Sequence, residues 1–150
     1  MAYTTISQLQ SRLGSTLYAR LTDRVNGTTA DATVAQELVD QAEALANARL
    51  ARRYATPIDL TAHPELTDIL EARALDLAEY LAWRDSPFAN DIPERVRLVY
   101  EETLQWFASV AAGAIDLPAS SPPASRTAVD DSLRYTASPR PFTHDELDGL

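Results

Sequence analysis

Residues 31–57 have the sequence DATVAQELVDQAEALANARLARRYATP, which predicts one long helix with a sharp end. Asp31 suits the N-cap position, because its carboxylate can accept hydrogen bonds from the free amides of the first turn. Pro57 blocks continuation of the helix and moves Thr56 out of the helical region. A helix of this length spans about 36 Å, so we expect the other helices to pack on it. Its apolar residues recur every three to five positions, as on a helix with one buried face, at Val34, Leu38, Ala42, Leu45, Leu50 and Tyr54.

Two shorter helices are predicted before this stretch, over residues 6–13 and 15–21. Thr5 and Gln8 have the spacing of a capping box, in which each residue satisfies a free backbone amide of the other. Gly14 suits the C-cap position, because glycine adopts a positive φ without strain. Local signals therefore mark both ends of the first helix.

Two further helices are predicted after the long stretch, and a proline marks the start of each. Pro64 and Pro93 are both followed by glutamate, and both residue types are favoured in the first helical turn. The apolar period of the first of these helices continues to about Trp83, and the second helix is predicted to end at Gly113. The predicted fold class is all-α: a small bundle of about four to five helices around the long helix, with an extended C-terminal arm.

The composition changes after residue 117, so we divide the chain into a helical domain, residues 1–117, and a C-terminal tail, residues 118–150. The tail holds five of the nine prolines and has no helical periodicity. Two interpretations of its last residues stay open: a docking segment for a partner, or a loosely ordered tail. The residues that suggest docking are Arg140, Phe142, Leu147 and Leu150.

The net charge of −9 excludes broad adhesion to nucleic acid, because such adhesion depends on neutralising phosphates. Every basic residue is an arginine. An acidic wall repels DNA and leaves it mobile, so DNA can pass nearby without sequence-specific binding. No apolar run approaches the roughly 20 residues of a membrane span, and no signal peptide is recognised. We therefore expect no membrane partner.

No catalytic motif is recognised. The chain has only four glycines and lacks a nucleophile elbow, a phosphate-binding loop and a dinucleotide fingerprint. Cysteine is absent, and His63 and His144 lie far apart in the sequence. Asp23 opens a loop, but Val25 and Gly27 stand where a calcium loop needs oxygen ligands. We therefore expect neither an enzyme nor a bound cofactor or metal.

The end of the long stretch carries a candidate interaction site, formed by Arg52, Arg53, Tyr54 and Pro57. Two interpretations of the arginines stay open. They complement the negative end of the helix dipole, or they bind carboxylates of a neighbouring helix or subunit. Asp76 lies in an otherwise apolar helix, and we expect it to form a salt bridge with Arg53 inside the fold.

An ordered set of short motifs extends over residues 2–117. The motifs are Ala2-Tyr3-Thr4-Thr5 with Leu9 and Gly14, Leu21-Thr22-Asp23-Arg24, Leu50-Ala51-Arg52-Arg53-Tyr54 with Pro57, Pro64-Glu65-Leu66, Asp76-Leu77-Ala78-Glu79-Tyr80-Leu81, Tyr100 and Gly113. No single motif is specific, but the set in this order and spacing resembles the Mu-type bacteriophage Gp36 family. The ending, residues 140–150, also resembles an arginine–aromatic–Ser/Thr segment of some members.

The resemblance implies a structural virion protein, a head–tail connector or head-completion adaptor in the neck of a phage or prophage particle, assembled in the host cytoplasm. Such adaptors form rings with copies of themselves, commonly twelve-fold, beneath the portal protein and above a stopper or tail-terminator protein. DNA passes through the channel of the ring. A tail-completion or stopper protein of the same neck is the alternative, and a small helical binding or regulatory module of the host is a third possibility.

Overall fold

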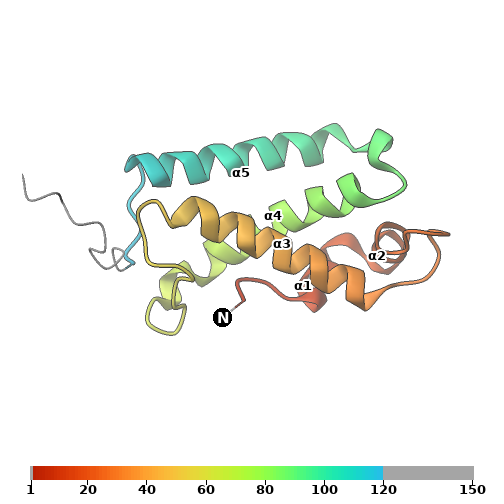
Figure 1. Cartoon of the computed structure of the whole chain (residues 1–150), viewed down its shortest axis with the longest axis horizontal. Helices are drawn as coiled ribbons and strands as arrows, with labels where there is room; N and C mark the ends of the chain where they lie inside the picture. Colours follow the sequence, from red (N-terminus) through yellow and green to blue (C-terminus); the bar gives the residue numbers. More distant parts are fainter. Residues whose placement is uncertain (1, 120–150) are drawn as a thin grey trace, which may run out of the picture.

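The computed structural model describes residues 2–119, and this part of the chain contains helices and no strand. The helices are α1 (Ile6–Leu13), α2 (Ser15–Thr22), α3 (Ala32–Leu50), α4 (Thr67–Asp85) and α5 (Glu94–Ala112), with short 3-10 helices η1 (Pro64–Leu66) and η2 (Ala89–Asp91). Figure 1 shows α5 running alongside α3, with α1 and α2 at the end of the molecule opposite the C-terminal segment. The predicted all-α fold class is confirmed.

The first two helices follow the predicted local signals. The backbone amide of Thr5 donates to Gln8 Oε1 at 2.7 Å, and the backbone amide of Gln8 donates to Thr5 Oγ1 at 3.3 Å. These bonds are the predicted capping box. Gly14, at φ +78°, separates α1 from α2, and α2 extends one residue beyond the predicted 15–21.

Helix α3 begins as predicted but ends earlier. The Asp31 carboxylate accepts two amides of the first turn, at 2.8 and 3.2 Å. The predicted end near Pro57 is wrong, because the helix stops at Leu50. The carbonyl of Leu50 accepts the amides of both Arg53 and Tyr54, each at 2.9 Å, and this tight turn redirects the chain. Helix α3 is therefore about 28 Å long rather than 36 Å.

The later helices begin at the predicted prolines. Pro64 opens η1, which leads into α4, and α4 extends two residues past the predicted Trp83 to Asp85. Helix α5 follows Pro93 and ends at Gly113, whose backbone is left-handed at φ +83°. A left-handed residue at this position is a common helix end, and glycine adopts it without a steric cost.

Helix α4 lies at the centre of the bundle, in contact with α1, α2, α3 and α5. Residues 74–79 are all buried, so this part of the helix is covered on every side. Asp76 and Glu79 fall within it and keep only 8% and 6% of their surface exposed. Within residues 2–119, no helix combines the length and the apolar character that crossing a bilayer requires.

Candidate interaction surface

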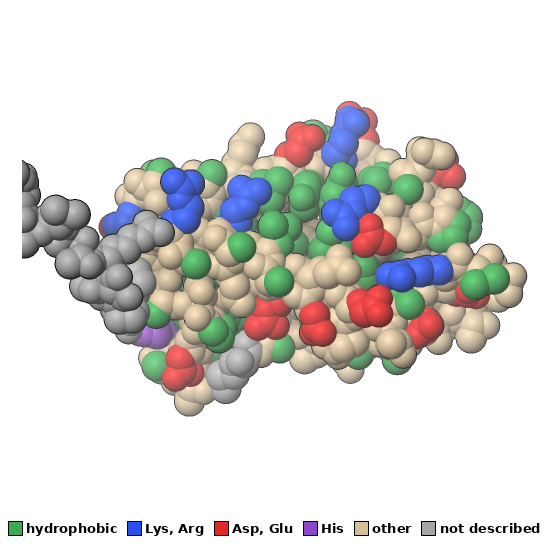
Figure 2. Space-filling model, viewed as in Figure 1, with side chains coloured by type: hydrophobic (Ala, Val, Ile, Leu, Met, Phe, Trp, Pro, Cys, Tyr) green, Lys and Arg blue, Asp and Glu red, His purple; other side chains and the backbone are tan. Residues whose placement is uncertain are grey.

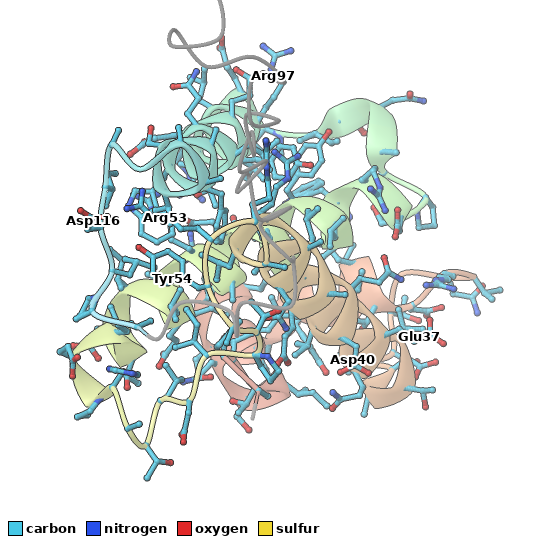
Figure 3. The ribbon with its side chains drawn as sticks, turned by 60° about the vertical axis from the view of Figure 1, so that its left-hand side comes forward. Glu37, Asp40, Arg53, Tyr54, Arg97 and Asp116 are labelled. Atoms are coloured by element: carbon cyan, nitrogen blue, oxygen red, sulfur yellow. The ribbon has the colours of Figure 1, made fainter. Side chains whose placement is uncertain are left out.

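The end of the molecule where α3 and α5 finish carries two of the predicted residues, Arg53 and Tyr54. Tyr54 is buried, and its Oη accepts a hydrogen bond from the backbone amide of Leu117 at 2.8 Å. Arg53 Nη2 lies 2.5 Å from Asp116 Oδ1, and Figure 3 shows these two side chains facing each other close to Tyr54. We call Arg53, Tyr54, Gly113, Asp116 and Leu117 the C-terminal junction, because they fasten the segment after α5 to the end of α3.

Gly113 is the point of closest backbone approach in the C-terminal junction. A methyl group added there would overlap the Arg53 guanidinium group. The positive φ of Gly113 would also strain any residue with a side chain. Glycine at this position therefore serves both the end of α5 and the packing of Arg53.

A second set of hydrogen bonds fixes the loop after α3. Tyr3 Oη donates to Asn47 Oδ1 at 2.7 Å and accepts the backbone amide of Ile58 at 2.8 Å. Burial raises the pKa of Tyr3, although the bond from Ile58 acts in the opposite direction. Pro57 is exposed beside this anchor and follows a cis peptide bond from Thr56. The loop therefore presents Pro57 at the surface while its neighbour Ile58 is buried.

Arg52 lies on the surface next to the C-terminal junction. It lines an open concavity of about 450 Å³ together with Ala48, Ala51 and Ala111, between the ends of α3 and α5. On the face drawn in Figure 2, arginine side chains lie at the upper left, toward these helix ends, and acidic side chains lie along the lower edge. At the top and on the right of this face, arginine and acidic side chains lie next to one another, so the local excess of arginine is confined to the upper left.

A buried ionic network joins three helices. Arg12 of α1 lies 2.5 Å from Asp76 and 2.7 Å from Glu79, both on α4. Thr103 of α5 donates to Asp76 Oδ2 at 2.9 Å, and Arg95 of α5 lies 3.2 Å from Glu79. Desolvation lowers the pKa of Arg12, but the two carboxylates outweigh it, so that this pKa is raised above its ordinary value. The network therefore holds a permanently charged guanidinium between two carboxylates.

The predicted salt bridge between Asp76 and Arg53 is wrong. Asp76 pairs with Arg12, and Arg53 pairs with Asp116. Asp76 lies in the middle of α4, where its partners come from α1, from α5 and from Arg73 of α4 itself, whereas Arg53 follows the end of α3.

The loop that begins at Asp23 is closed by its own backbone. The Asp23 carboxylate accepts four amides at distances between 2.9 and 3.2 Å, from Val25, Asn26, Thr28 and Thr29. These bonds, the one from Asn26 foremost, hold the pKa of Asp23 well below its usual range. Over residues 2–119, no group of three or more acidic, histidine or cysteine side chains is arranged to hold a metal ion.

The predicted interaction residues fall into two groups. Arg52, Arg53, Tyr54 and Pro57 lie at one end of the bundle, with Tyr54 in the core and Pro57 at the surface. The others lie outside the described residues: Arg140, Phe142, Leu147 and Leu150. Sequence reasoning missed Asp116 as a partner, and the available signal was a short apolar and acidic run directly after the helix end at Gly113.

The fold and these contacts define a small all-α protein whose C-terminal segment is fastened to one end of a helical body. The family described as bacteriophage Mu, Gp36 matches residues 3–133. The chain belongs to this family, which confirms the resemblance carried by the motifs and makes the protein a phage structural protein. No curated protein matches the chain.

Proposed function

We propose that this protein is a head–tail connector that acts by assembly in the neck of the virion. It forms a ring with copies of itself beneath the portal protein, joins the capsid to the tail, and lets DNA pass through its channel. Membership of the Mu Gp36 family is the observation that carries this proposal. The protein works without catalysis, through noncovalent contacts with the portal on one side and a stopper or tail-terminator protein on the other.

The C-terminal junction supports this function, because it gives the rest of the chain a defined point of departure. Leu117 is 8% exposed, and its amide is bonded to Tyr54, so the chain is still part of the helical body at this residue. Residues 118–150 follow directly. A connector of this design grips a neighbouring molecule with the C-terminal residues while the helical body keeps its shape.

The acidic charge of the chain also suits a DNA channel. The net charge is −9, and seven described arginines already face carboxylates of the same chain. Those arginines are poorly available to phosphate groups. DNA is then repelled by the wall and slides past it.

Deletion of residues 118–150 tests the proposal in a phage or prophage that otherwise assembles normally. We expect the truncated protein to keep its helical circular dichroism signal and to lose attachment of tails to heads. Glu101→Gln is a matched control, because Glu101 is exposed on α5 and its loss leaves the C-terminal residues intact. Normal particles formed by the truncated protein would reject the function assigned to these residues.

Binding to purified particles separates this function from its alternatives. A connector is expected to be monomeric in light scattering and to co-sediment with tail-less heads. Binding to isolated tails, and not to heads, would instead identify a tail-completion or stopper protein of the same neck. A chain that ignores both and stays a monomer or dimer at every concentration would be a helical regulatory module of the host.

A further inference from the structure

Arg49 and Arg52 differ from the other arginines of residues 2–119, because they have no partner among the described residues. Seven of the others lie within 3.9 Å of a carboxylate. Arg20 lies over the ring of Phe88, with its guanidinium carbon 4.0 Å from the ring centre. The chain has 22 acidic residues and 13 arginines, so most arginines find an acidic partner. Two neighbouring arginines without one mark a local excess of positive charge.

These two arginines lie beside the concavity at the ends of α3 and α5. Arg52 lines it, and Arg49 is three residues earlier, in the last turn of α3. The other lining residues are alanines: Ala48, Ala51 and Ala111. Guanidinium groups above a small apolar surface suit a peptide segment that carries both carboxylates and apolar side chains.

We propose that this concavity binds residues 142–150 of the same chain. The segment, FTHDELDGL, contains no arginine. Its acidic residues are Asp145, Glu146 and Asp148, and its apolar residues are Phe142, Leu147 and Leu150. The charges of the segment are thus opposite to those of the unpaired arginines.

The rest of the helical body disfavours this segment. Residues 2–119 contain more carboxylates than arginines, and acidic side chains such as Glu37 and Asp40 lie on the exposed face of α3 (Figure 3). An acidic segment is repelled by such a surface and attracted only where cations are in excess. Arg49 and Arg52 therefore define both the place and the preferred partner.

The length of the chain allows this contact within one molecule. Ala119 lies at the same end of the bundle, where it lines a concavity together with Ala55 and Pro57 of the loop after α3. Residues 120–141 can extend over at most about 75 Å, whereas α3 is about 28 Å long. The segment can therefore return to the concavity from its departure point. Docking within one chain also benefits from a high effective concentration.

When residues 142–150 are docked in the concavity, a partner that binds them must first displace them from it. The segment is then withheld from weak partners and released to one that offers stronger contacts. This inference does not depend on the proposed function, because it concerns the free chain. Its test is therefore made on the isolated protein, without heads or tails.

Two spin labels in the full chain test the proposal by a distance measurement. The chain has no cysteine, so Ala44→Cys and Gly149→Cys place labels only at the chosen sites. Ala44 is exposed on α3, one turn before Ala48. We expect a narrow short-distance population at low salt. Arg49→Glu with Arg52→Glu should reduce that population at least roughly fivefold, because two attractive charges become repulsive.

Two further variants control this measurement. Reversal of the segment charges, Asp145→Arg, Glu146→Arg and Asp148→Arg, should restore the short distance in the reversed-arginine background. Arg97→Glu makes the same charge change on α5 (Figure 3). Arg97 is exposed, and its guanidinium group lies 3.9 Å from the Glu94 carboxylate. This variant should leave the short distance unchanged. Circular dichroism confirms that each variant is folded.

Three results would overturn the proposal. The first is a broad distance distribution in the parent protein at low salt. The second is a short-distance population that Arg49→Glu with Arg52→Glu does not reduce. The remaining role of these arginines would then be to complement the dipoles at the ends of α3 and α5. The third is a short distance that disappears when labelled chains are diluted with unlabelled ones, because the segment would then bind a second copy.

Discussion

Two arginine–aspartate contacts of the same length serve different purposes in this protein. Arg12 and Asp76 are 2.5 Å apart, and so are Arg53 and Asp116. The aspartate side chain is 10% exposed in the first pair and 74% exposed in the second. Water competes for the second pair far more than for the first, in which the Arg12 side chain is 29% exposed. Contact distance therefore says little about the energy of an ion pair, and burial decides it.

The two regions differ in what each pair connects. The buried network joins α1, α4 and α5, so its loss affects the whole bundle. The C-terminal junction joins only the segment after α5 to the end of α3. We therefore expect changes in the network to lower global stability. Changes in the junction should mainly free the C-terminal segment.

The largest effect is expected from Arg12→Met. This change removes the closest guanidinium partner of the buried Asp76 and Glu79, which keep only the longer contacts to Arg73 and Arg95. It should lower the free energy of unfolding by about 3 kcal/mol in urea titrations. The matched control is Arg24→Met, which breaks an exposed pair with Glu37 and should cost less than about 1 kcal/mol. Equal losses in the two variants would remove burial as the explanation.

Gly113→Ala should have the next largest effect. The left-handed backbone and the overlap with the Arg53 guanidinium together should cost about 2 kcal/mol of unfolding free energy. In an Arg53→Ala background the overlap is absent, and the cost should fall to about 1 kcal/mol. A cost that is the same in both backgrounds would show that Arg53 does not constrain this position.

Tyr54→Phe should cost about 1 kcal/mol, because it removes the only acceptor that the structure gives to the Leu117 amide within residues 2–119. Hydrogen exchange at that amide should become faster, while exchange in α4 stays unchanged. Tyr80→Phe is the control, because the Tyr80 ring stacks on Tyr100 and the substitution keeps that ring. Unchanged exchange at Leu117 would mean that the junction is held by other contacts.

The smallest effect is expected from Arg53→Met, at about 0.5 kcal/mol in low salt. The exposed pair with Asp116 is screened by salt, so this cost should disappear at about 1 M salt, where the Debye length is about 3 Å. The cost of Arg12→Met should persist at the same salt concentration. If the cost of Arg53→Met did not depend on salt, the pair of Arg53 and Asp116 would be shielded from solvent in the same way as the buried network.

Helix ends were predictable wherever one or two neighbouring residues decide them. The capping box of Thr5 and Gln8, the Asp31 cap and the glycine end at Gly113 all use hydrogen bonds or backbone angles within a few residues. The end of α3 at Leu50 escaped prediction. Residues 51–56 contain no strong helix breaker before Pro57, and the turn there serves the burial of Tyr54.

The amino-acid sequence by itself determined the all-α class, most helix ends and the family, because these depend on local pattern and on an ordered set of motifs. The tertiary structure decided which charges meet. Asp76 forms an ion pair with Arg12, 64 positions away, and Arg53 forms one with Asp116. Such pairs form only when packed helices bring distant residues together, and no spacing along the chain encodes that approach. The burial that separates a stabilising network from a surface contact is likewise a property of the assembled bundle.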